Sequence, residues 1–308
     1  MLKFKRKYTV VWIALLALLA TCQGQTQATS QPQVNAKARR WLMWKASSPT
    51  TTVYMLGSIH LGDKELYPLP DALESAFNAS KVLVVEVNIK KIDQAGAMKL
   101  VQQYGFYPEG DSLSKHLPRN LSDSLDDFCS KHGLPRALLD KFKPWVAAIT
   151  IEALTLQQAG EDPNLGVDVH FLDESKQPQR IEELETADFQ MTVLSSGTEA
   201  EQQELLAETL KEMDKPKEHL LEIQSAFLSG DQDVMVKFLQ AHNTPKALYK
   251  KLLDDRNGPM AERIDGYLKG KEQCFVVVGA AHLVGDKGIV KLLQQKNYKV
   301  ELITAEAK

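Results

Sequence analysis

The chain has 308 residues, of which 44% are hydrophobic and 25% charged, and its formal net charge at pH 7 is −3. These values are ordinary for a globular domain of this size. The slight acidity argues against nucleic acid as a partner, because phosphate binding needs clustered Lys and Arg.

The chain opens with the pattern of a secretory signal. Four basic residues precede the apolar run 10–20, and Thr21, Cys22 and a polar stretch follow it. A basic start, a short apolar run and small residues are typical of a signal peptide, and the run is too short for a membrane span. We therefore expect an exported bacterial protein whose residues 1–28 are removed.

Two processing routes remain open. Leu-Ala-Thr-Cys at 19–22 resembles a lipobox, so Cys22 would be lipidated, whereas Thr26-Gln-Ala28 suits an ordinary signal peptidase. The protein would be an envelope lipoprotein attached to the membrane in the first case and a free periplasmic protein in the second. Either cut takes the net charge to −7, because four of the 37 basic residues lie in the signal. Residues 29–40 then form a flexible tether.

Strands are predicted near both ends of residues 41–308. Two apolar segments in 41–60, split by Ser-Ser-Pro-Thr, indicate a hairpin. Residues 69–80 have helical spacing, and 81–88 form a short apolar run typical of a buried strand. This strand–helix–strand order predicts a parallel pair.

The middle of the chain, 95–250, is mostly helical in pattern. Helices are predicted at 166–174, 187–196, 199–213, 217–228 and 231–241, with a short strand at 178–185 between the first two. At the end of the chain, the pattern predicts a helix at 257–269, a buried strand at 274–282, a helix at 286–297 and a strand at 298–303. We expect one α/β (α+β) domain over 41–308, with a central mixed sheet of N- and C-terminal strands around a large helical region.

Two apolar runs end in the same local pattern. YMLGSIHLGD (54–63) and VVVGAAHLVG (276–285) both continue into Gly-x-x-His, so His60 and His282 are expected at strand ends. Functional groups gather at the carboxyl ends of strands in such sheets, and Gly57 and Gly279 allow the backbone to turn or approach another chain. If these strands are neighbours, both imidazoles face one site.

Glu86 follows the apolar run VLVV and is a third member of this group. A carboxylate is costly to bury without a partner. Two histidines and a glutamate are a known ligand set for a catalytic divalent metal that keeps water positions open. The simpler interpretation is two hydrogen-bonded structural histidines and a solvated glutamate.

Other reactive residues give weaker signals. Cys129 and Cys274 are either a disulfide or buried thiols. Ser58 lacks the Gly-x-Ser-x-Gly elbow of hydrolases, and no glycine-rich phosphate loop is present. We expect no chemistry from the remaining histidines, His116, His132, His170, His219 and His242.

The segments 54–87 and 274–301 resemble the TraB/GumN family, which includes the Tiki metalloproteases. That family is marked by two Gly-x-x-His motifs and a glutamate after the second strand. GVDVHFLDES, IEELETADFQ and DDRNGPMAERI resemble its central and Arg-Asn motifs, so the likeness spans roughly residues 41–304. It implies a fold akin to the erythromycin esterase and ChaN-like proteins.

The resemblance also implies roles for single residues. His60, Glu86 and His282 match the metal or catalytic positions, with Mn, Co, Zn or Fe as the divalent ion. Other motif positions are matched by Asp168, Glu185, Gln190, Arg256 and Asn257. In the mechanism that we derive from residue chemistry rather than from the resemblance, Asp168 or Glu185 would be the general base and Arg256 would steady the oxyanion, although Glu86 could instead be the base.

The function expected from this resemblance is a metal-dependent hydrolase, first of all a Tiki-like metallopeptidase that uses a metal-activated water. A metal-dependent esterase is the neighbouring alternative. An envelope protein that binds haem, a metal or a peptide without turnover is the alternative from another class. The substrate and the oligomeric state are left open.

Overall fold

The structure is a computed structural model that describes residues 39–176, 178–241 and 246–306. The expected signal, Cys22 and residues 29–38 of the expected tether lie outside the described residues. Arg40 already belongs to the first strand, so the fold begins one residue before the predicted boundary at 41. Within the described ranges, no helix is both long and apolar enough to cross a membrane.

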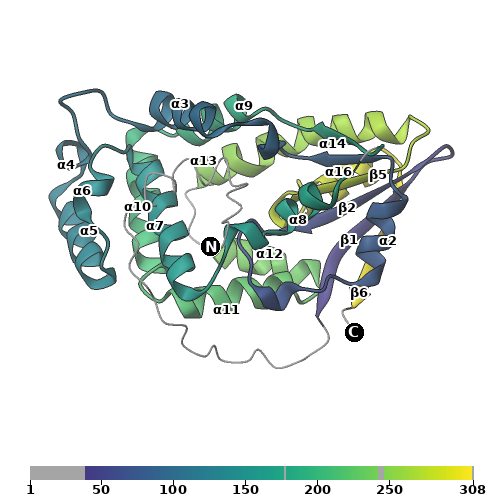
Figure 1. The fold of residues 1–308 in the computed structure, drawn as a ribbon, viewed down its shortest axis with the longest axis horizontal. Coiled ribbons are helices and arrows are strands. Elements are labelled where there is room, and N and C mark those ends of the chain that lie inside the picture. The colour runs from purple at the N-terminus through teal and green to yellow at the C-terminus, as the bar shows by residue number, and fades with distance from the viewer. Residues whose placement is uncertain (1–38, 177, 242–245, 307–308) are drawn as a thin grey trace, which may run out of the picture.

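A six-stranded mixed sheet occupies one end of the molecule, and the helical middle of the chain occupies the other (Figure 1). The first four strands in spatial order are parallel to one another, while β1 is antiparallel to both β2 and β6. This arrangement confirms the predicted mixed sheet and the β1–β2 hairpin. In spatial order the strands are β4 (Arg180–Glu183), β3 (Val82–Val85), β5 (Cys274–Gly279), β2 (Thr52–Ser58), β1 (Arg40–Ser47) and β6 (Lys299–Glu306).

One prediction about strand pairing is wrong. β2 and β3 are parallel, but they do not pair, because β5 lies between them and pairs with both. β5 is an apolar strand whose first five residues are all buried, as expected for the centre of a parallel sheet. A strand from the far end of the chain therefore separates two strands that follow each other in sequence.

The two crossovers next to β5 run in opposite directions along the sheet. α2 (Asp71–Ala79) connects β2 to β3, whereas α16 (Ile289–Gln295) connects β5 to β6 on the other side. Since parallel crossovers are right-handed, opposite directions place these helices on opposite faces. β2 and β5 thus form a topological switch point, where open α/β sheets bind ligands.

The helices of the middle region begin and end where local signals predict. α7 starts with Pro144 and is followed by the left-handed C-cap Gly160, and α10 starts with a capping box of Thr198 and Glu201. The other α-helices are α3 (Gln94–Gly105), α4 (Leu113–His116), α5 (Arg119–His132), α6 (Arg136–Leu139), α7 (Pro144–Ala159), α8 (Val167–Glu174), α9 (Ala187–Ser195), α10 (Glu199–Glu212), α11 (Pro216–Phe227), α12 (Gln232–Ala241), α13 (Lys246–Tyr249), α14 (Asp255–Leu268) and α15 (Ala280–Leu283). Shorter turns are η1 (Lys64–Leu66), η2 (Ile89–Lys91), η3 (Pro163–Leu165) and the π-helical η4 (Lys250–Asp254).

Buried hydrophobic residues fall into two clusters among the described residues. The sheet cluster surrounds the strands, and the helical cluster is formed mainly by α3, α5, α7 and α10. Cys274 belongs to the first and Cys129 to the second, and both are buried free thiols. The structure therefore has no disulfide between them. The prediction of a single domain stays a prediction.

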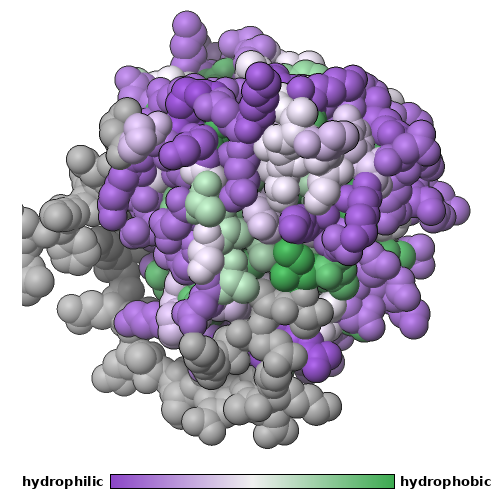
Figure 2. Space-filling view, turned by 90° about the vertical axis from the view of Figure 1, so that its right-hand side faces the viewer, coloured by the Kyte–Doolittle hydropathy of each residue, from purple (hydrophilic) through white to green (hydrophobic). Residues whose placement is uncertain are grey.

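The surface seen from the sheet end is largely hydrophilic, with one small area of hydrophobic side chains (Figure 2). Large hydrophobic side chains that are exposed among the described residues lie on four different elements, as Phe189, Leu221, Val234 and Leu302. Scattered exposure of this kind is normal for a globular protein.

Candidate functional site

Polar side chains that follow four parallel strands lie at one edge of the sheet. Glu185 follows β4, Glu86 follows β3, His282 lies in α15 directly after β5, and His60 follows β2. Because the strands are neighbours in the order β4-β3-β5-β2, these groups line up along the carboxyl edge. The predicted meeting of distant histidines and a glutamate at this edge depends on that strand order.

The two glycines of the Gly-x-x-His motifs make room for this edge. A Cβ atom on Gly57 would lie 3.0 Å from the Cβ of Ala280, so glycine lets α15 pack over β2. A Cβ atom on Gly279 would lie 3.3 Å from Glu86 Oε1. Glycine therefore lets the Glu86 carboxylate reach the backbone of the neighbouring strand.

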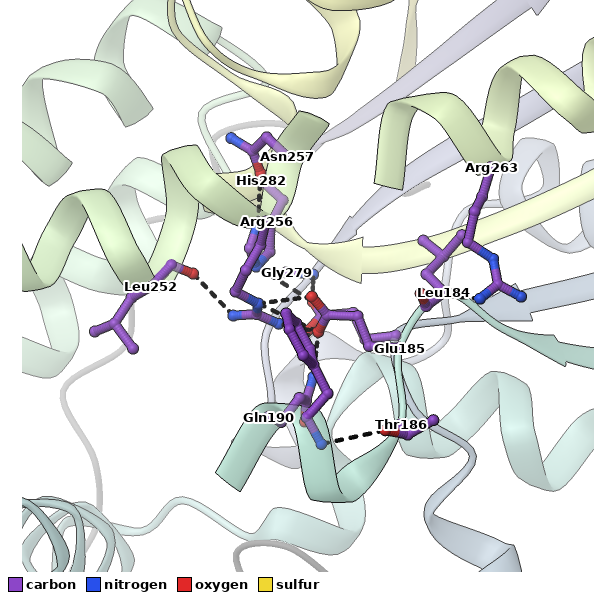
Figure 3. A network of polar contacts seen from close by, with 12 residues as sticks. Leu184, Glu185, Thr186, Gln190, Leu252, Arg256, Asn257, Arg263, Gly279 and His282 are labelled. Carbon is purple, nitrogen blue, oxygen red and sulfur yellow. Dashed lines mark hydrogen bonds and ion pairs between the residues drawn. The ribbon is translucent and has the colours of Figure 1, made fainter. Parts of the chain in front are cut away.

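Glu86 is the centre of a buried hydrogen-bond network, and Figure 3 shows the network with Gln190, Arg256 and Gly279 labelled. Its Oε1 accepts from the Gly279 backbone N–H at 2.7 Å, and its Oε2 accepts from Gln190 Nε2 at 3.1 Å and from Arg256 Nη2 at 2.9 Å. Burial raises the pKa of Glu86, but His282, Arg256, His60 and the Gly279 N–H lower it to about 2. The carboxylate is therefore ionised at neutral pH.

Arg256 joins Glu86 to a second buried carboxylate, Glu185. Arg256 donates to Glu185 through Nε at 2.9 Å and through Nη2 at 2.6 Å, and its Nη1 donates to the Leu252 carbonyl at 2.8 Å. Gln190 also donates to Glu185, at 3.1 Å. The cluster contains two carboxylates and one guanidinium, so its net charge is −1 when His282 is neutral.

His282 is held by Asn257, and both side chains are buried. His282 Nδ1 lies 2.6 Å from Asn257 Oδ1, and Nε2 lies 3.8 Å from Glu86 Oε1. Burial lowers the pKa of His282, and the Glu86 charge, which raises it, does not restore it. A neutral imidazole therefore faces an ionised carboxylate.

His60 pairs with Asp168 at the other end of the edge. Its Nδ1 lies 3.3 Å from Asp168 Oδ1, and 43% of its side chain is accessible to water. Burial lowers the pKa of His60, but Asp168 and, more weakly, Glu86 raise it to about 9. Asp168 Oδ1 is buried and has no hydrogen bond of good geometry from any described residue. His60 is thus positively charged near neutral pH.

Sequence reasoning missed Glu152 on α7. Burial and the nearby Glu212 raise its pKa to about 7, and the His60 charge partly opposes this shift. The helical middle of the chain therefore adds a carboxyl group whose pKa depends on the charge of His60. Its sequence surroundings, a helix far from either Gly-x-x-His motif, give no signal of this.

The predicted metal ligands lie along the carboxyl edge of the sheet, but they do not form one cluster. Among the residues that the structure describes, no group of three or more His, Cys, Asp or Glu side chains is placed to hold a metal ion. His282 and Glu86 face each other, but His60 comes from β2, two strands away from the Glu86 strand. Strands are spaced about 4.8 Å apart, so the backbones at these two positions are separated by roughly 10 Å.

A family model matches most of the chain. The family model described as TraB/PrgY/gumN matches residues 42–302, which covers both Gly-x-x-His corners and the network between them. The chain belongs to the TraB/PrgY/gumN family.

Two proteins that are described as uncharacterized are similar to this chain. The uncharacterized protein YbaP of Escherichia coli (strain K12) is 23% identical over 245 residues, covering 78% of this chain and 87% of YbaP. An uncharacterized protein of Treponema pallidum (strain Nichols) is 21% identical over 304 residues, covering 92% of this chain and 89% of that protein. No solved structure matches.

The other motif residues of this TraB/PrgY/gumN chain have structural partners. Glu185 and Arg256 bind each other, so the donors of Arg256 that were predicted to face an oxyanion are used by protein groups. Thr186, directly after Glu185, caps α9. His170 Nε2 lies 2.9 Å from Glu74 Oε1.

Proposed function

We propose that this chain is an exported metal-dependent hydrolase that acts through a metal-activated water. The observation that carries the proposal is the facing pair of Glu86 Oε1 and His282 Nε2, 3.8 Å apart. Asn257 Oδ1 accepts the proton of Nδ1, so Nε2 bears a lone pair toward the carboxylate. Two facing acceptors are repulsive unless a donor or a cation lies between them.

The donor atoms fit a divalent cation in kind and in charge. Glu86 is ionised and His282 is neutral, which are the forms that ligate metals. The buried cluster of Glu86, Glu185 and Arg256 has a net charge of −1, which a cation would balance. A third ligand would come from His60, which would have to lose its proton to bind the cation.

The residues of this chain divide the remaining tasks. A bound divalent metal would lower the pKa of its water toward neutrality and polarise a carbonyl. Gln190 and Arg256 fix the orientation of Glu86, so that Oε1 faces His282. Asp168 lies beside His60 and is the residue that we assign as acceptor of the water proton.

A peptide is the substrate class that we propose first, on the resemblance to the Tiki metalloproteases, and an ester is second. The secretory pattern of residues 1–28 supports action in the bacterial envelope, either free in the periplasm or anchored through Cys22.

The test is the metal content of the protein purified without chelator or His-tag, measured by mass spectrometry. We expect near-stoichiometric Mn, Co, Zn or Fe in the wild type and its loss in folded His60→Ala and His282→Ala. His132→Ala, at the far end of α5, is the matched control and should keep the metal. Absence of metal after incubation with each of the four ions would refute the proposal.

Binding without turnover is the second candidate, and one observation favours it. Both oxygens of Glu86 and of Glu185 already accept hydrogen bonds from protein groups. A ligand could occupy the edge while neither Glu86 nor Glu185 is available as a base. A metal-loaded protein that binds peptides but cleaves neither peptides nor esters would support this candidate.

A further inference from the structure

We infer that Asn257 is a positioning residue that fixes His282 in the tautomer with a protonated Nδ1 and an unprotonated Nε2 directed at Glu86. The consequence for metal binding rests on the proposed function, whereas the tautomer itself follows from hydrogen-bond geometry alone.

The orientation of the Asn257 amide is determined by its second partner. Asn257 Nδ2 donates to the backbone carbonyl of Lys287 at 2.9 Å. A carbonyl oxygen can only accept, so the amide nitrogen must face Lys287 and the amide oxygen must face His282. A flipped amide would place two oxygens against each other in a site where Asn257 is only 2% exposed.

The amide orientation then determines the histidine tautomer. Asn257 Oδ1 lies 2.6 Å from His282 Nδ1 and can only accept, so Nδ1 carries the proton. In the neutral ring the lone pair is therefore on Nε2. That atom faces Glu86 Oε1. Asn257 therefore orients His282 so that two acceptors, Nε2 and Glu86 Oε1, face each other. This arrangement is favourable only if a cation or a proton lies between them.

The position of Asn257 is itself secured on both sides. It lies in the first turn of α14, directly after the π-helical η4, next to Arg256 of the carboxylate network. Lys287, whose carbonyl it binds, also forms an ion pair with Asp254 at 2.8 Å. The loop between α15 and α16 is thereby tied to the start of α14, and Asn257 cannot turn without breaking that tie.

The first experiment determines the tautomer of His282 in the metal-free wild-type chain. Two-bond proton–nitrogen correlation spectra near pH 8 distinguish protonated from unprotonated ring nitrogens, and His282→Gln assigns the signal. We expect a protonated Nδ1 and an unprotonated Nε2 for His282. A protonated Nε2 would overturn the inference, and this result does not depend on any variant folding.

Three variants separate positioning from a general structural role. Asn257→Asp loses the bond to the Lys287 carbonyl but keeps an acceptor toward Nδ1, so it should keep the tautomer. Asn257→Leu removes the acceptor and should move the proton to Nε2. Gln202→Leu is the matched control, because it removes another buried amide that donates to a backbone carbonyl, at 2.8 Å. It should leave the His282 spectrum unchanged. An unchanged tautomer in folded Asn257→Leu would contradict the positioning role.

Metal titration then tests the consequence separately. Partners of metal-bound histidines typically contribute about 10–100-fold in affinity, so Asn257→Leu should bind Zn²⁺ or Mn²⁺ about 10–100-fold more weakly than Gln202→Leu. If the tautomer is as inferred and the wild type binds neither ion, the proposed function fails and the assignment of Asn257 stands. Equal metal affinity of Asn257→Leu and the control variant would overturn the role of Asn257 in the metal site.

Discussion

At the scale of single residues, Glu86 connects three elements of the site through hydrogen bonds. Its carboxylate receives a backbone N–H from β5, an amide from α9 and a guanidinium from α14. Such a group is stable only because each of these partners is present, since an uncompensated buried charge is costly. The side chain therefore links site geometry to fold stability.

Removing this charge tests both roles. Glu86→Gln breaks a buried pair with Arg256, so we expect it to lower the free energy of unfolding by about 3 kcal/mol and to abolish metal binding. Glu272→Gln breaks a fully exposed pair with Arg180 and should leave the free energy of unfolding almost unchanged. Urea denaturation and metal content measure the two effects. Full metal content in folded Glu86→Gln would show that Glu86 is not a ligand.

At the scale of elements, two loops are held in close contact beneath His60. The segment after β2 bonds the segment before α8 through Val167 N to Ile59 O at 3.0 Å and through paired bonds between Gly62 and Asp162. A Cβ atom on Gly166 would lie only 2.4 Å from the His60 carbonyl oxygen. Glycine at 166 is thus required for His60 and Asp168 to lie side by side.

Gly166→Ala should therefore disturb the His60 loop. We expect a loss of about 1–3 kcal/mol in unfolding free energy, because the clash is with backbone and cannot be relieved by a rotamer change. Gly266→Ala, on α14 with open space around it, should instead be neutral or stabilising by up to about 1 kcal/mol. Thermal and urea unfolding of both variants give the comparison. Equal stability of the two would contradict a tight contact at 166.

At the scale of the whole molecule, the site lies where the two hydrophobic clusters meet. Ile59 packs against the sheet cluster and Leu61 belongs to the helical cluster, so His60 lies between them. The same holds for the segment between Leu184 and Met191, which carries Glu185 and Gln190. Binding sites are common at such junctions, because groups from both sides meet there.

A second polar contact crosses this junction. Gln224 on α11 donates to Asp63 and to Glu161, both at 3.2 Å, so it joins the helical region to the loop after β2. Both carboxyl groups are buried, and burial together with Asp63 raises the pKa of Glu161 to about 7. Ionised Glu161 is therefore unfavourable in the folded protein.

This contact predicts a pH dependence of stability. The folded-state pKa of Glu161 exceeds its ordinary value of 4.5, so the folded protein binds the proton more tightly and loses stability as pH rises from about 4.5 to about 7. Glu161→Gln should match the wild type at pH 4.5 and exceed it by about 1–3 kcal/mol at pH 8. Urea denaturation at both pH values measures this. Glu262→Gln, at a mostly exposed side chain, should differ little at either pH. A pH-independent difference for Glu161→Gln would rule out the titration as its cause.

The sequence by itself determined the fold class, the order of elements and the family. Apolar runs of period two or of unbroken character, helix caps and turn residues are local signals, and they predicted the hairpin, the buried strands and the helical middle. The two Gly-x-x-His motifs and the carboxylate after VLVV also identified which strand ends carry the site. Their steric reason, room for α15 and for Glu86, agrees with the expected use of glycine.

Only the tertiary structure decided which groups meet at that edge. β5 enters between β2 and β3, which places His60 two strands from Glu86 and gives Glu86 the Gly279 N–H, 193 residues away in sequence. The partners of Arg256 and the tautomer set by Asn257 follow from the same packing. Local patterns specify which faces of an element are buried, but strand order and long-range polar contacts depend on how all elements pack together.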